Sequence, residues 1–303
     1  MANIIPTSIY SVEDAYKNNP DLKKSDIQII REWCQKQPHL PKIDDVFLIL
    51  FLHSNYYQLE PTKNTIENFY TVRTHVPEFF SQRDPFLKEL REQFTVVATL
   101  PMKNKTKDGY QLVCGAMTDP DASHYSFLDA TKGFLMITEL GTLELGLSNG
   151  LAYIVDAKNF SLGHVGRLNL MGIKKFLYYI QEAAPVRLKH IHILNANTAA
   201  EALLNMSKPF MRKELIQMIR FHHSLKSLEE FVEIDTLPND FGGKAGSLKD
   251  LMNEQVKKLE ENREWFLKDE ATMRVNESLR VGKAKSSNDL FGVEGSFKKL
   301  DID

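Results

Sequence analysis

The strongest constraint on the fold is a regular alternation of short β-type runs with helical patterns between residues 95 and 245. The β-type runs are bounded by glycines or polar turns and cover residues 111–117, 151–157, 190–196 and 231–235. Helical patterns lie between them, at about 126–145 and 168–182, and a further one follows the third run. Strands that alternate with helices predict βαβ units and a largely parallel sheet. The expected fold class is therefore α/β.

Two flanking regions differ in character from this α/β region. Residues 1–94 read as helices, because the pair Asp44-Asp45 precedes an apolar run and Glu60-Pro61 opens another apolar pattern. Residues 247–279 read as one helix rich in Lys and Glu. The final 24 residues have loop composition, with apolar side chains that could dock on the domain: Leu290, Phe291, Val293 and Phe297. The predicted division is a helical region 1–94, an α/β domain 95–245, and a C-terminal helix with tail 246–303.

Composition excludes several classes of protein. The net charge of −2 gives no general attraction to nucleic acid. The two cysteines, Cys34 and Cys114, predict neither a disulfide framework nor a cysteine metal site. The N-terminus lacks the pattern of a secretory signal, and the longest apolar run is far shorter than a membrane span. A cytoplasmic, monomeric globular protein without metal or cofactor is expected.

The segment 207–222 has the pattern of an amphipathic helix. Ser207 and Pro209 fit its first turn. Projected at a helical period, its apolar residues Met211, Leu215, Met218 and Ile219 share one sector, and Arg212, Lys213 and Arg220 share the next. Such a helix suits a membrane–water boundary, where the apolar side enters the acyl region and the basic side meets phosphates. The same pattern is also that of a core-packing helix with a solvated face.

An ordered set of motifs resembles the CRAL-TRIO lipid-transfer family, which includes tocopherol- and retinaldehyde-binding proteins. The motifs are GLAYIVDAKNFSLGHV (150–165), RLKHIHILNA (187–196), KPF (208–210), RFHH (220–223) and LPNDFGG (237–243). The closing FGVEGSFKKLDID (291–303) is similar to the tail of the insect branch of that family, which includes alpha-tocopherol transfer protein-like chains. The resemblance implies an apolar cavity floored by the sheet and covered by a helical gate at about residues 197–222.

The resemblance implies a set of ligand-binding residues on the strands, the preceding helix and the gate. The candidates from the strands and helix are Phe127, Phe134, Ile137, Leu140, Tyr153, Val155, Ile191 and Ile193. The candidates from the gate are Leu203, Leu204, Met206, Phe210, Met211, Leu215, Met218 and Ile219. Plain core packing is the alternative for each of them. Because successive strand residues face opposite sides, about half of the strand candidates are expected to face away from the pocket.

Some members of the family bind phosphatidylinositol bisphosphate in a basic cleft near the gate. The matching or neighbouring cations here are Arg187, Lys189, Arg212, Lys213 and Arg220. The match is incomplete. Glu214 and Met218 occupy two positions that are basic in the tocopherol carrier, and His53-Ser54-Asn55 stands where the family often has arginines. A basic cluster that only solvates the fold is the alternative interpretation.

Catalytic patterns are weak. His190 and His192 share one strand face, but no third ligand accompanies them in the pattern, and His222-His223 are interpreted as structural. Asp156 ends a strand, where α/β enzymes often place catalytic groups, yet the resemblance makes it structural. Nucleophile-elbow, Walker and dinucleotide-binding glycine motifs are absent from the sequence. No catalytic or metal-binding residue is therefore predicted.

Two functions remain as hypotheses. In the first, the protein binds one small lipophilic ligand, such as a tocopherol, retinoid, carotenoid or phospholipid, and transfers it between membranes as a cytoplasmic, transiently membrane-associated carrier. In the second, it is a phosphoinositide-binding signalling or scaffold module whose pocket is regulatory or vestigial.

Overall fold

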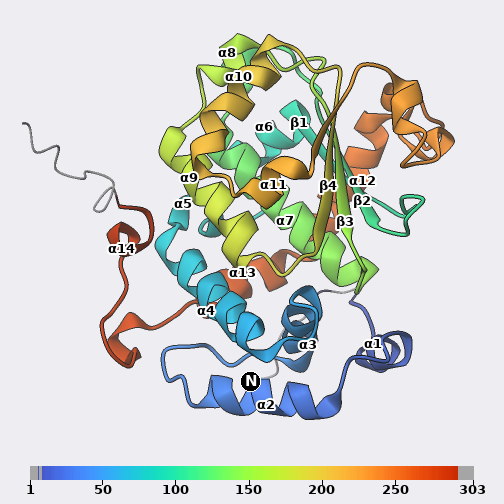
Figure 1. Cartoon of the computed structure of the whole chain (residues 1–303). Helices are drawn as coiled ribbons and strands as arrows, with labels where there is room; N and C mark the ends of the chain where they lie inside the picture. Colours follow the sequence, from blue (N-terminus) through green and yellow to red (C-terminus); the bar gives the residue numbers. More distant parts are fainter. Residues whose placement is uncertain (1–5, 7–8, 293–303) are drawn as a thin grey trace, which may run out of the picture.

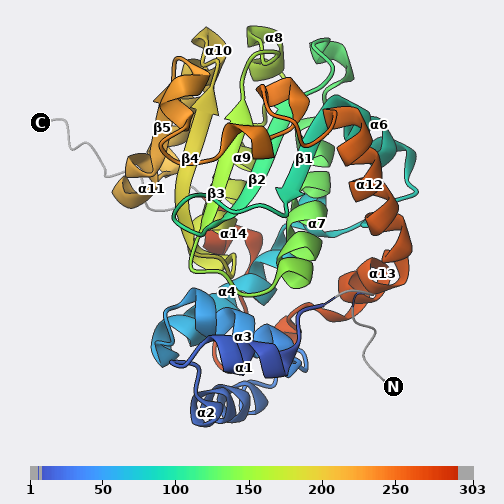
Figure 2. The same cartoon turned by 90° about the vertical axis from the view of Figure 1, so that its right-hand side faces the viewer.

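The computed structural model describes residues 6 and 9–292 and contains a five-stranded sheet. The strands follow one another across the sheet in the order β1-β2-β3-β4-β5, as Figure 2 shows. β1 is antiparallel to β2, and the remaining pairs are parallel. Their bounds are Val97–Met102, Gln111–Met117, Leu151–Asp156, Leu188–Leu194 and Ile219–His222. The predicted α/β fold with a mainly parallel sheet is confirmed.

Two strands differ from the prediction. β1 was not predicted, because its sequence VATLPM contains Pro101; it lies at the edge of the sheet, where a residue without an N–H is tolerated. The run 231–235 is wrong as a strand, since it forms a turn followed by the 3₁₀ helix Ile234–Thr236. The fifth strand is β5, which the prediction placed inside the gate helix. The four residues of β5, Ile-Arg-Phe-His, alternate between apolar and polar side chains. So short a run fits the period of a strand as well as that of a helix.

Helices cover both sides of the sheet. Figure 1 shows α9, α10 and α11 on one side and α12 on the other. The connections that follow β2, β3 and β4 contain, in chain order, η1 Ala122–His124, α7 Phe127–Leu145, α8 Leu162–Val165, α9 Leu170–Tyr178, the π-helical turn η2 Tyr179–Ala183, α10 Thr198–Ser207, η3 Lys208–Phe210 and α11 Lys213–Gln217. α7 begins at the predicted residue because the side chain of Ser126 caps it.

The N-terminal region is helical, as predicted. Its helices are α1 Val12–Asn18, α2 Lys24–Gln35, α3 Asp45–Ser54, α4 Leu59–His75, α5 Pro77–Phe80 and α6 Lys88–Val96. α3 is apolar on nearly all sides and lies buried among α1, α2 and α4. α4 also packs on the π-helical turn η2, so the helical region rests directly on the α/β domain.

The predicted C-terminal helix 247–279 is in fact two helices. The segment 223–247 contains η4 Leu225–Leu228, the 3₁₀ turn η5 already described at 234–236, and η6 Asn239–Phe241. After it come α12 Leu248–Glu261, α13 Arg263–Thr272, η7 Glu277–Leu279 and α14 Ser287–Phe291. The break falls at Asn262, whose side chain donates to the Lys258 carbonyl oxygen. Phe291 docks as predicted, edge-on to Tyr178 with 5.3 Å between ring centroids. Val293 and Phe297, with the rest of the tail similar to the insect branch, lie outside the described residues.

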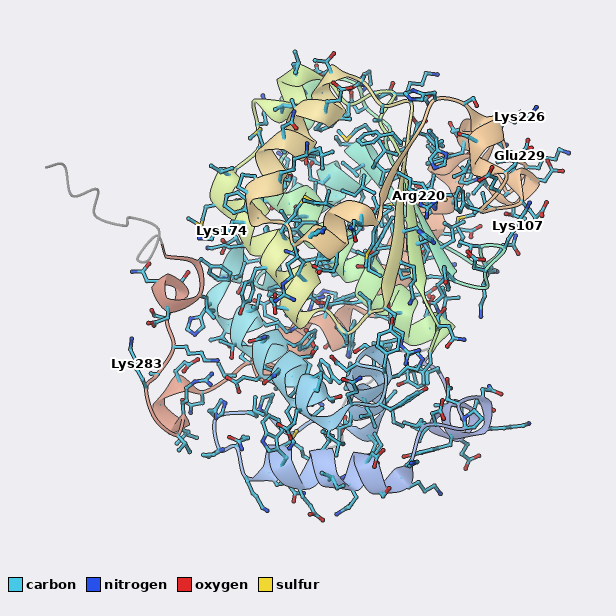
Figure 3. All side chains as sticks on the ribbon, in the orientation of Figure 1. Lys107, Lys174, Arg220, Lys226, Glu229 and Lys283 are labelled. Carbon is cyan, nitrogen blue, oxygen red and sulfur yellow. The ribbon has the colours of Figure 1, made fainter. Side chains whose placement is uncertain are left out.

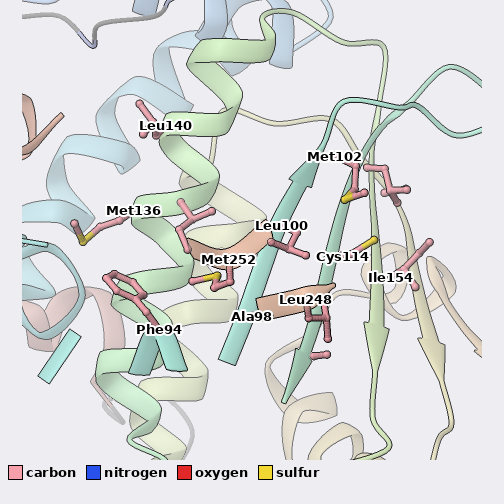
Figure 4. Packing of buried hydrophobic residues seen from close by; sticks show 14 of the residues in the cluster. Phe94, Ala98, Leu100, Met102, Cys114, Met136, Leu140, Ile154, Leu248 and Met252 are labelled. Atoms are coloured by element: carbon pink, nitrogen blue, oxygen red, sulfur yellow. The ribbon is translucent and has the colours of Figure 1, made fainter. Parts of the chain in front are cut away.

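The core between β1, β2, α7 and α12 is filled by aliphatic, Met and Phe side chains (Figure 4). Leu100, Cys114 and Ile154 come from the sheet, Met136 and Leu140 from α7, and Met252 from α12. This core occupies the sheet face that bears the even-numbered residues of β2 and β3, so the opposite face is left for the cavity.

A cluster of four charged side chains, three of them buried, joins the predicted regions to one another. Arg73 of α4 and Arg83 are 2% and 0% exposed, and each contacts both Glu139 of α7 and Asp269 of α13. Arg73 Nη1 lies 2.8 Å from Glu139 Oε1, and Arg83 Nη1 lies 2.5 Å from Asp269 Oδ2. Although desolvation raises the pKa of Glu139, Arg73 and Arg83 lower it below its ordinary value. The division of the chain at 94/95 and 245/246 stays a prediction. The charge cluster takes at least one residue from each of the three predicted parts.

Candidate functional site

An apolar cavity of about 370 Å³ lies between the sheet and helix α10. Two rows of side chains form its floor. The first row runs across β2 to β5 through Val113, Tyr153, Ile191 and Ile219. The second runs in the same order through Gly115, Val155, Ile193 and Phe221. The strand pairing thus places alternate residues of four strands on one surface.

The burial of these strand residues reflects the empty space in front of them. Tyr153, Val155 and Ile191 are only partly buried, although they belong to inner strands, whereas their neighbours Ile154 and His192 are fully buried on the other face. Gly115 begins the second row of the floor, on β2. A Cβ built there would meet only the Ala98 carbonyl oxygen, at 3.7 Å, so the missing side chain leaves room in the cavity.

Helix α10 covers the cavity with one stripe of its surface. The stripe has the spacing i, i+3, i+4, i+7 and consists of Ala200, Leu203, Leu204 and Ser207. Asn197 fixes the start of the helix, since its side chain accepts from the N–H groups of Ala199 and Ala200. Its Nδ2 also donates to the carbonyl oxygens of Ala157 and Phe160, both at 2.9 Å. The Asn197 side-chain amide thereby links the start of α10 to the loop that follows β3.

The single amphipathic helix predicted for 207–222 is wrong. The segment forms the 3₁₀ turn η3, the short helix α11 and the strand β5. Met206, Phe210 and Leu215 pack with Ile173 and Leu177 of α9 in a small apolar cluster behind the cover. The apolar stripe that covers the cavity therefore belongs to α10.

Nine of the sixteen predicted ligand-binding residues line the cavity: Phe134, Tyr153, Val155, Ile191, Ile193, Leu203, Leu204, Met211 and Ile219. The others lie elsewhere. Ile137 and Leu140 belong to the core between β1, β2, α7 and α12. Phe127 lies beside Phe79 and the α9 cluster, and Met218 follows α11. The sequence analysis missed wall residues from β1, β2, the β3–α8 loop and α9, namely Val97, Thr99, Val113, Gly115, Met117, Phe160 and Leu177. The period-2 pattern of β2 offered a signal for its three members.

A second, smaller space of about 70 Å³ adjoins the cavity at its first row of floor residues. Val113, Phe134 and Tyr153 line both spaces. The rings of Phe134 and Tyr153 are 5.7 Å apart, centroid to centroid. These two side chains therefore form the end wall of the cavity.

The five predicted phosphoinositide-binding cations lie in three places. Arg187 and Lys189 meet at the end of α3, where the Arg187 guanidinium stacks 4.2 Å from the Tyr56 ring centroid and Lys189 Nζ donates to Tyr56 Oη at 2.9 Å. Arg212 pairs with Glu182 near the cover, and Lys213 is exposed beside it.

Arg220 lies on the opposite face of the sheet, toward the segment with Lys226 and Glu229 (Figure 3). Its guanidinium is 4.9 Å from the centroid of the Phe231 ring. A shared basic face of Arg212, Lys213 and Arg220 is therefore wrong, because Arg220 is a strand residue that points away from the cavity side.

Two buried histidines, His192 and His222, form a pair on that same outer face, and His190 lies partly buried beside His192. His192 Nδ1 and His222 Nε2 are 2.8 Å apart, and His222 Nδ1 is 2.9 Å from Ser227 Oγ. Burial, together with His222, His190 and Arg220, lowers the pKa of His192 to about 3, which keeps it neutral at pH 7. Within residues 6 and 9–292, no three His, Cys, Asp or Glu side chains are arranged to hold a metal ion.

Asp156 has a structural role at the end of β3. Its Oδ1 accepts from the Asn195 side chain at 2.8 Å and from the Lys158 N–H at 2.9 Å. Asn195 has a φ of 49°, a left-handed conformation that asparagine tolerates better than most residues. The pair fixes the turn that leads from β4 to the cover.

Comparisons with known proteins agree with this geometry. Residues 148–250 match the divergent CRAL/TRIO domain, and residues 19–90 match the Pinta-like UBA domain. The chain is 25% identical over 246 residues to the alpha-tocopherol transfer protein-like protein of Mus musculus, covering 79% of this chain and 71% of that protein. It is 26% identical over 250 residues to clavesin-1 of Rattus norvegicus, covering 80% and 70%. The crystal structure of Sfh5 aligns at a TM-score of 0.45 and 12% identity, over 80% of this chain and 92% of that one.

The fold and the site define an α/β protein with an apolar cavity between its sheet and helix α10. The chain contains a CRAL-TRIO domain, and the predicted resemblance to that family is confirmed. These matches support a lipid-binding function for the chain. None of its described helices has the length and apolar character needed to cross a bilayer.

Proposed function

We propose that this protein binds a single small lipophilic ligand in the cavity between the sheet and α10 and transfers it between membranes. The cavity itself is the observation that carries the proposal. Its volume of about 370 Å³ suits one small molecule, and apolar side chains dominate its walls. Burying several hundred Å² of apolar ligand surface contributes several kcal/mol at roughly 25 cal/mol per Å², with no polar chemistry required.

Native mass spectrometry of the purified chain tests this function. We expect a bound apolar molecule of defined mass, which extraction would then identify as a tocopherol, retinoid, carotenoid, phospholipid or another lipophile. Protein that is repeatedly empty, yet binds phosphoinositide vesicles tightly, would support the signalling or scaffold alternative. In the proposed function the carrier is cytoplasmic, monomeric and only transiently membrane-bound, and it uses no cofactor and catalyses no reaction.

An exposed apolar surface next to the cover supports transfer at a membrane. Leu162 of α8 is 60% exposed, and Leu170 and Met171 at the start of α9 are 52% and 41% exposed. α8 and α9 both contact α10, so this surface adjoins the element that closes the cavity. Arg167 is exposed within the same stretch and can meet lipid phosphates. We propose that this surface inserts into the bilayer interface.

Replacing Leu162 and Leu170 together with glutamate is expected to weaken binding to phosphatidylcholine–phosphatidylserine vesicles by about a hundredfold or more, because each leucine loses about 1.5–3 kcal/mol of burial. Vesicle co-sedimentation measures the effect. Leu279→Glu with Val281→Glu is the matched control, since both residues are exposed but follow α13. Equal loss in the two double variants would contradict docking through α8 and α9, whereas ligand binding is expected to persist in both.

We further propose that Arg187 and Lys189 bind an anionic headgroup, a phosphoinositide above all, and so assist docking and release. One nitrogen of the Arg187 guanidinium, Nη2, is buried without a hydrogen-bond partner, while its Nε donates to the His53 carbonyl oxygen at 2.7 Å. Tyr56 and Tyr57, at φ values of 54° and 62°, form the adjacent turn. The proposal keeps Arg212 and Lys213 as further headgroup-binding cations beside α10. Arg220 could contribute only on the outer face of the sheet, away from the cavity.

Charge reversal at both residues, Arg187→Glu with Lys189→Glu, is expected to weaken binding to vesicles with phosphatidylinositol bisphosphate by about 30-fold or more, since each basic residue contributes about 1 kcal/mol near an anionic surface. Flotation assays with and without the phosphoinositide measure the change. Lys226→Glu with Lys249→Glu alters the net charge equally at exposed sites on other elements. Persistent phosphoinositide-dependent binding in the first variant would place the headgroup site elsewhere.

A further inference from the structure

The loop before β3 contains the only Asn-Gly pair of the sequence, Asn149-Gly150. Asn149 is exposed, and Gly150 is buried where the chain enters β3. In such a pair the backbone nitrogen of the second residue can attack the asparagine Cγ. Glycine allows this attack best, because it has no side chain to obstruct the ring that forms and adopts many backbone angles readily. Asparagine is accordingly among the chemically labile residues of proteins.

Packing keeps glycine at position 150. A Cβ built there would lie 2.4 Å from Tyr110 Cδ1 and 2.6 Å from Lys189 Cγ, so any other residue would have to displace both side chains. The carbonyl group of Gly150 is fixed as well, because the Ser148 hydroxyl donates to its oxygen at 2.8 Å. The fold therefore depends on the very residue that makes Asn149 labile.

The two groups that react in such a pair are held here only by long contacts. Within the described residues, the Gly150 N–H has one partner, Ser148 Oγ at 3.5 Å, and forms no backbone hydrogen bond. The Asn149 side chain also has one partner in this part of the chain, Arg187 Nη1, which lies 3.5 Å from Asn149 Oδ1. Contacts of this length are weak, so the side chain can turn its Cγ toward the Gly150 nitrogen.

We propose that Asn149 is a site of deamidation, and that the charge it acquires weakens the binding of an anionic headgroup by Arg187 and Lys189. The second part rests on the proposed function. The Gly150 nitrogen forms a bond to Asn149 Cγ, the side-chain nitrogen leaves as ammonia with the Gly150 proton, and a five-membered succinimide ring results. One water molecule then opens the ring at either of its carbonyl groups, which gives isoaspartate or aspartate.

The new carboxylate lies beside the cations assigned to the headgroup. In aspartate it takes the place of the amide whose oxygen is 3.5 Å from Arg187 Nη1, so the guanidinium gains a charged partner within the protein. Lys189 adjoins the same loop at Gly150. A negative charge here engages one cation and repels an anionic headgroup. None of the residues 148–150 lines the cavity between the sheet and α10, so the modified protein keeps its affinity for a lipophilic ligand.

Prolonged incubation of the full chain at mildly alkaline pH, followed by peptide-mapping mass spectrometry, tests the site. We expect Asn149 to change from amide to acid faster than any other asparagine, and isoaspartate methyltransferase to label the same peptide. Asn149→Gln is the control, because glutamine has to close a larger and less favourable ring. A synthetic peptide of residues 147–153 shows that the conditions allow the reaction. Asn149 that stays unmodified in the protein while this peptide converts would overturn the site.

Flotation with vesicles that contain phosphatidylinositol bisphosphate tests the consequence. Asn149→Asp is expected to bind about fivefold more weakly than the wild type, since one charge near an anionic surface contributes about 1 kcal/mol. Incubated wild type is expected to weaken in the same direction, whereas incubated Asn149→Gln is not. Asn253→Asp is the matched variant, because it adds the same charge at an exposed site on α12.

Two results would overturn the effect on headgroup binding. They are modification of Asn149 without any loss of vesicle binding, and an equal loss in Asn253→Asp. If the unmodified wild type shows no binding that depends on phosphoinositide, the proposed headgroup site itself fails and this effect fails with it. The mass spectra decide separately whether Asn149 is modified.

Discussion

Replacing Asp269 with alanine is expected to lower the free energy of unfolding by about 3–5 kcal/mol. The substitution leaves Arg73 and Arg83 buried with only the partly exposed Glu139 between them, so one buried positive charge loses its partner. Breaking a buried pair on one side is much more costly than removing an exposed one. Urea unfolding followed by circular dichroism measures the change.

Asp235→Ala is the matched control. Asp235 pairs with Lys244 at 2.7 Å, but their side chains are 69% and 75% exposed. We expect its effect to stay below about 1 kcal/mol, because solvent screens this pair. A loss in Asp269→Ala no larger than in Asp235→Ala would show that this cluster of four charges does not hold the helices together.

Filling the floor of the cavity at Gly115 is expected to weaken ligand binding by about 30-fold. Valine at this position would place its methyl groups where the ligand lies, between Val155 and the β1 edge, and overpacking of this kind costs about 1–3 kcal/mol. The fold should not suffer, because the new Cβ makes only an ordinary contact with the Ala98 oxygen and valine favours strands. Titration with the lipid that co-purifies measures affinity, and thermal unfolding checks stability.

Gly115→Ala serves as the graded control, since it adds only one carbon and is expected to reduce affinity less. Unchanged affinity in Gly115→Val, with a normal melting temperature, would mean that the ligand does not occupy the space above β2. Loss of stability in place of affinity would mean instead that this space is part of the packed core.

The sequence predicts the elements whose patterns are long or strongly marked. β2 and α7 have the predicted bounds to within a residue, because a capping serine and a glycine-bounded apolar run mark them. β1 and β5 were missed for different reasons. Pro101 argues against a strand unless the strand lies at an edge, and Ile219–His222 is too short for its period to be decided.

The candidate site is only partly predictable for a geometric reason. The sequence analysis named Tyr153, Val155, Ile191 and Ile193 as candidates and expected about half of them to face away from the pocket, but the structure places all four toward the cavity. The sequence could not tell that the cavity ends before Ile137 and Leu140, because the depth of a cavity depends on how helices pack. The prediction grouped Arg220 with Arg212 and Lys213 because a helix period was applied to a residue that lies in a strand. Neither Asn197 nor Gly115 carries a motif that marks its place.

Strand β5 attaches the segment that covers the cavity, residues 195–218, to the sheet. The chain leaves β4 at Leu194, passes over the cavity as α10 and α11, and returns as β5 to pair with β4 again. Both ends of this segment are thus held by the same strand, β4: one end continues directly from it, and the other end leads into β5, which pairs with it. We expect this segment to open without separating any strands of the sheet. The contacts that then break are those of α10 with α8 and α9, and those of residues 206–215 with α9 and the turn that follows it. The cargo would then leave toward Leu162 and Leu170, on the same side as the surface proposed to meet the membrane.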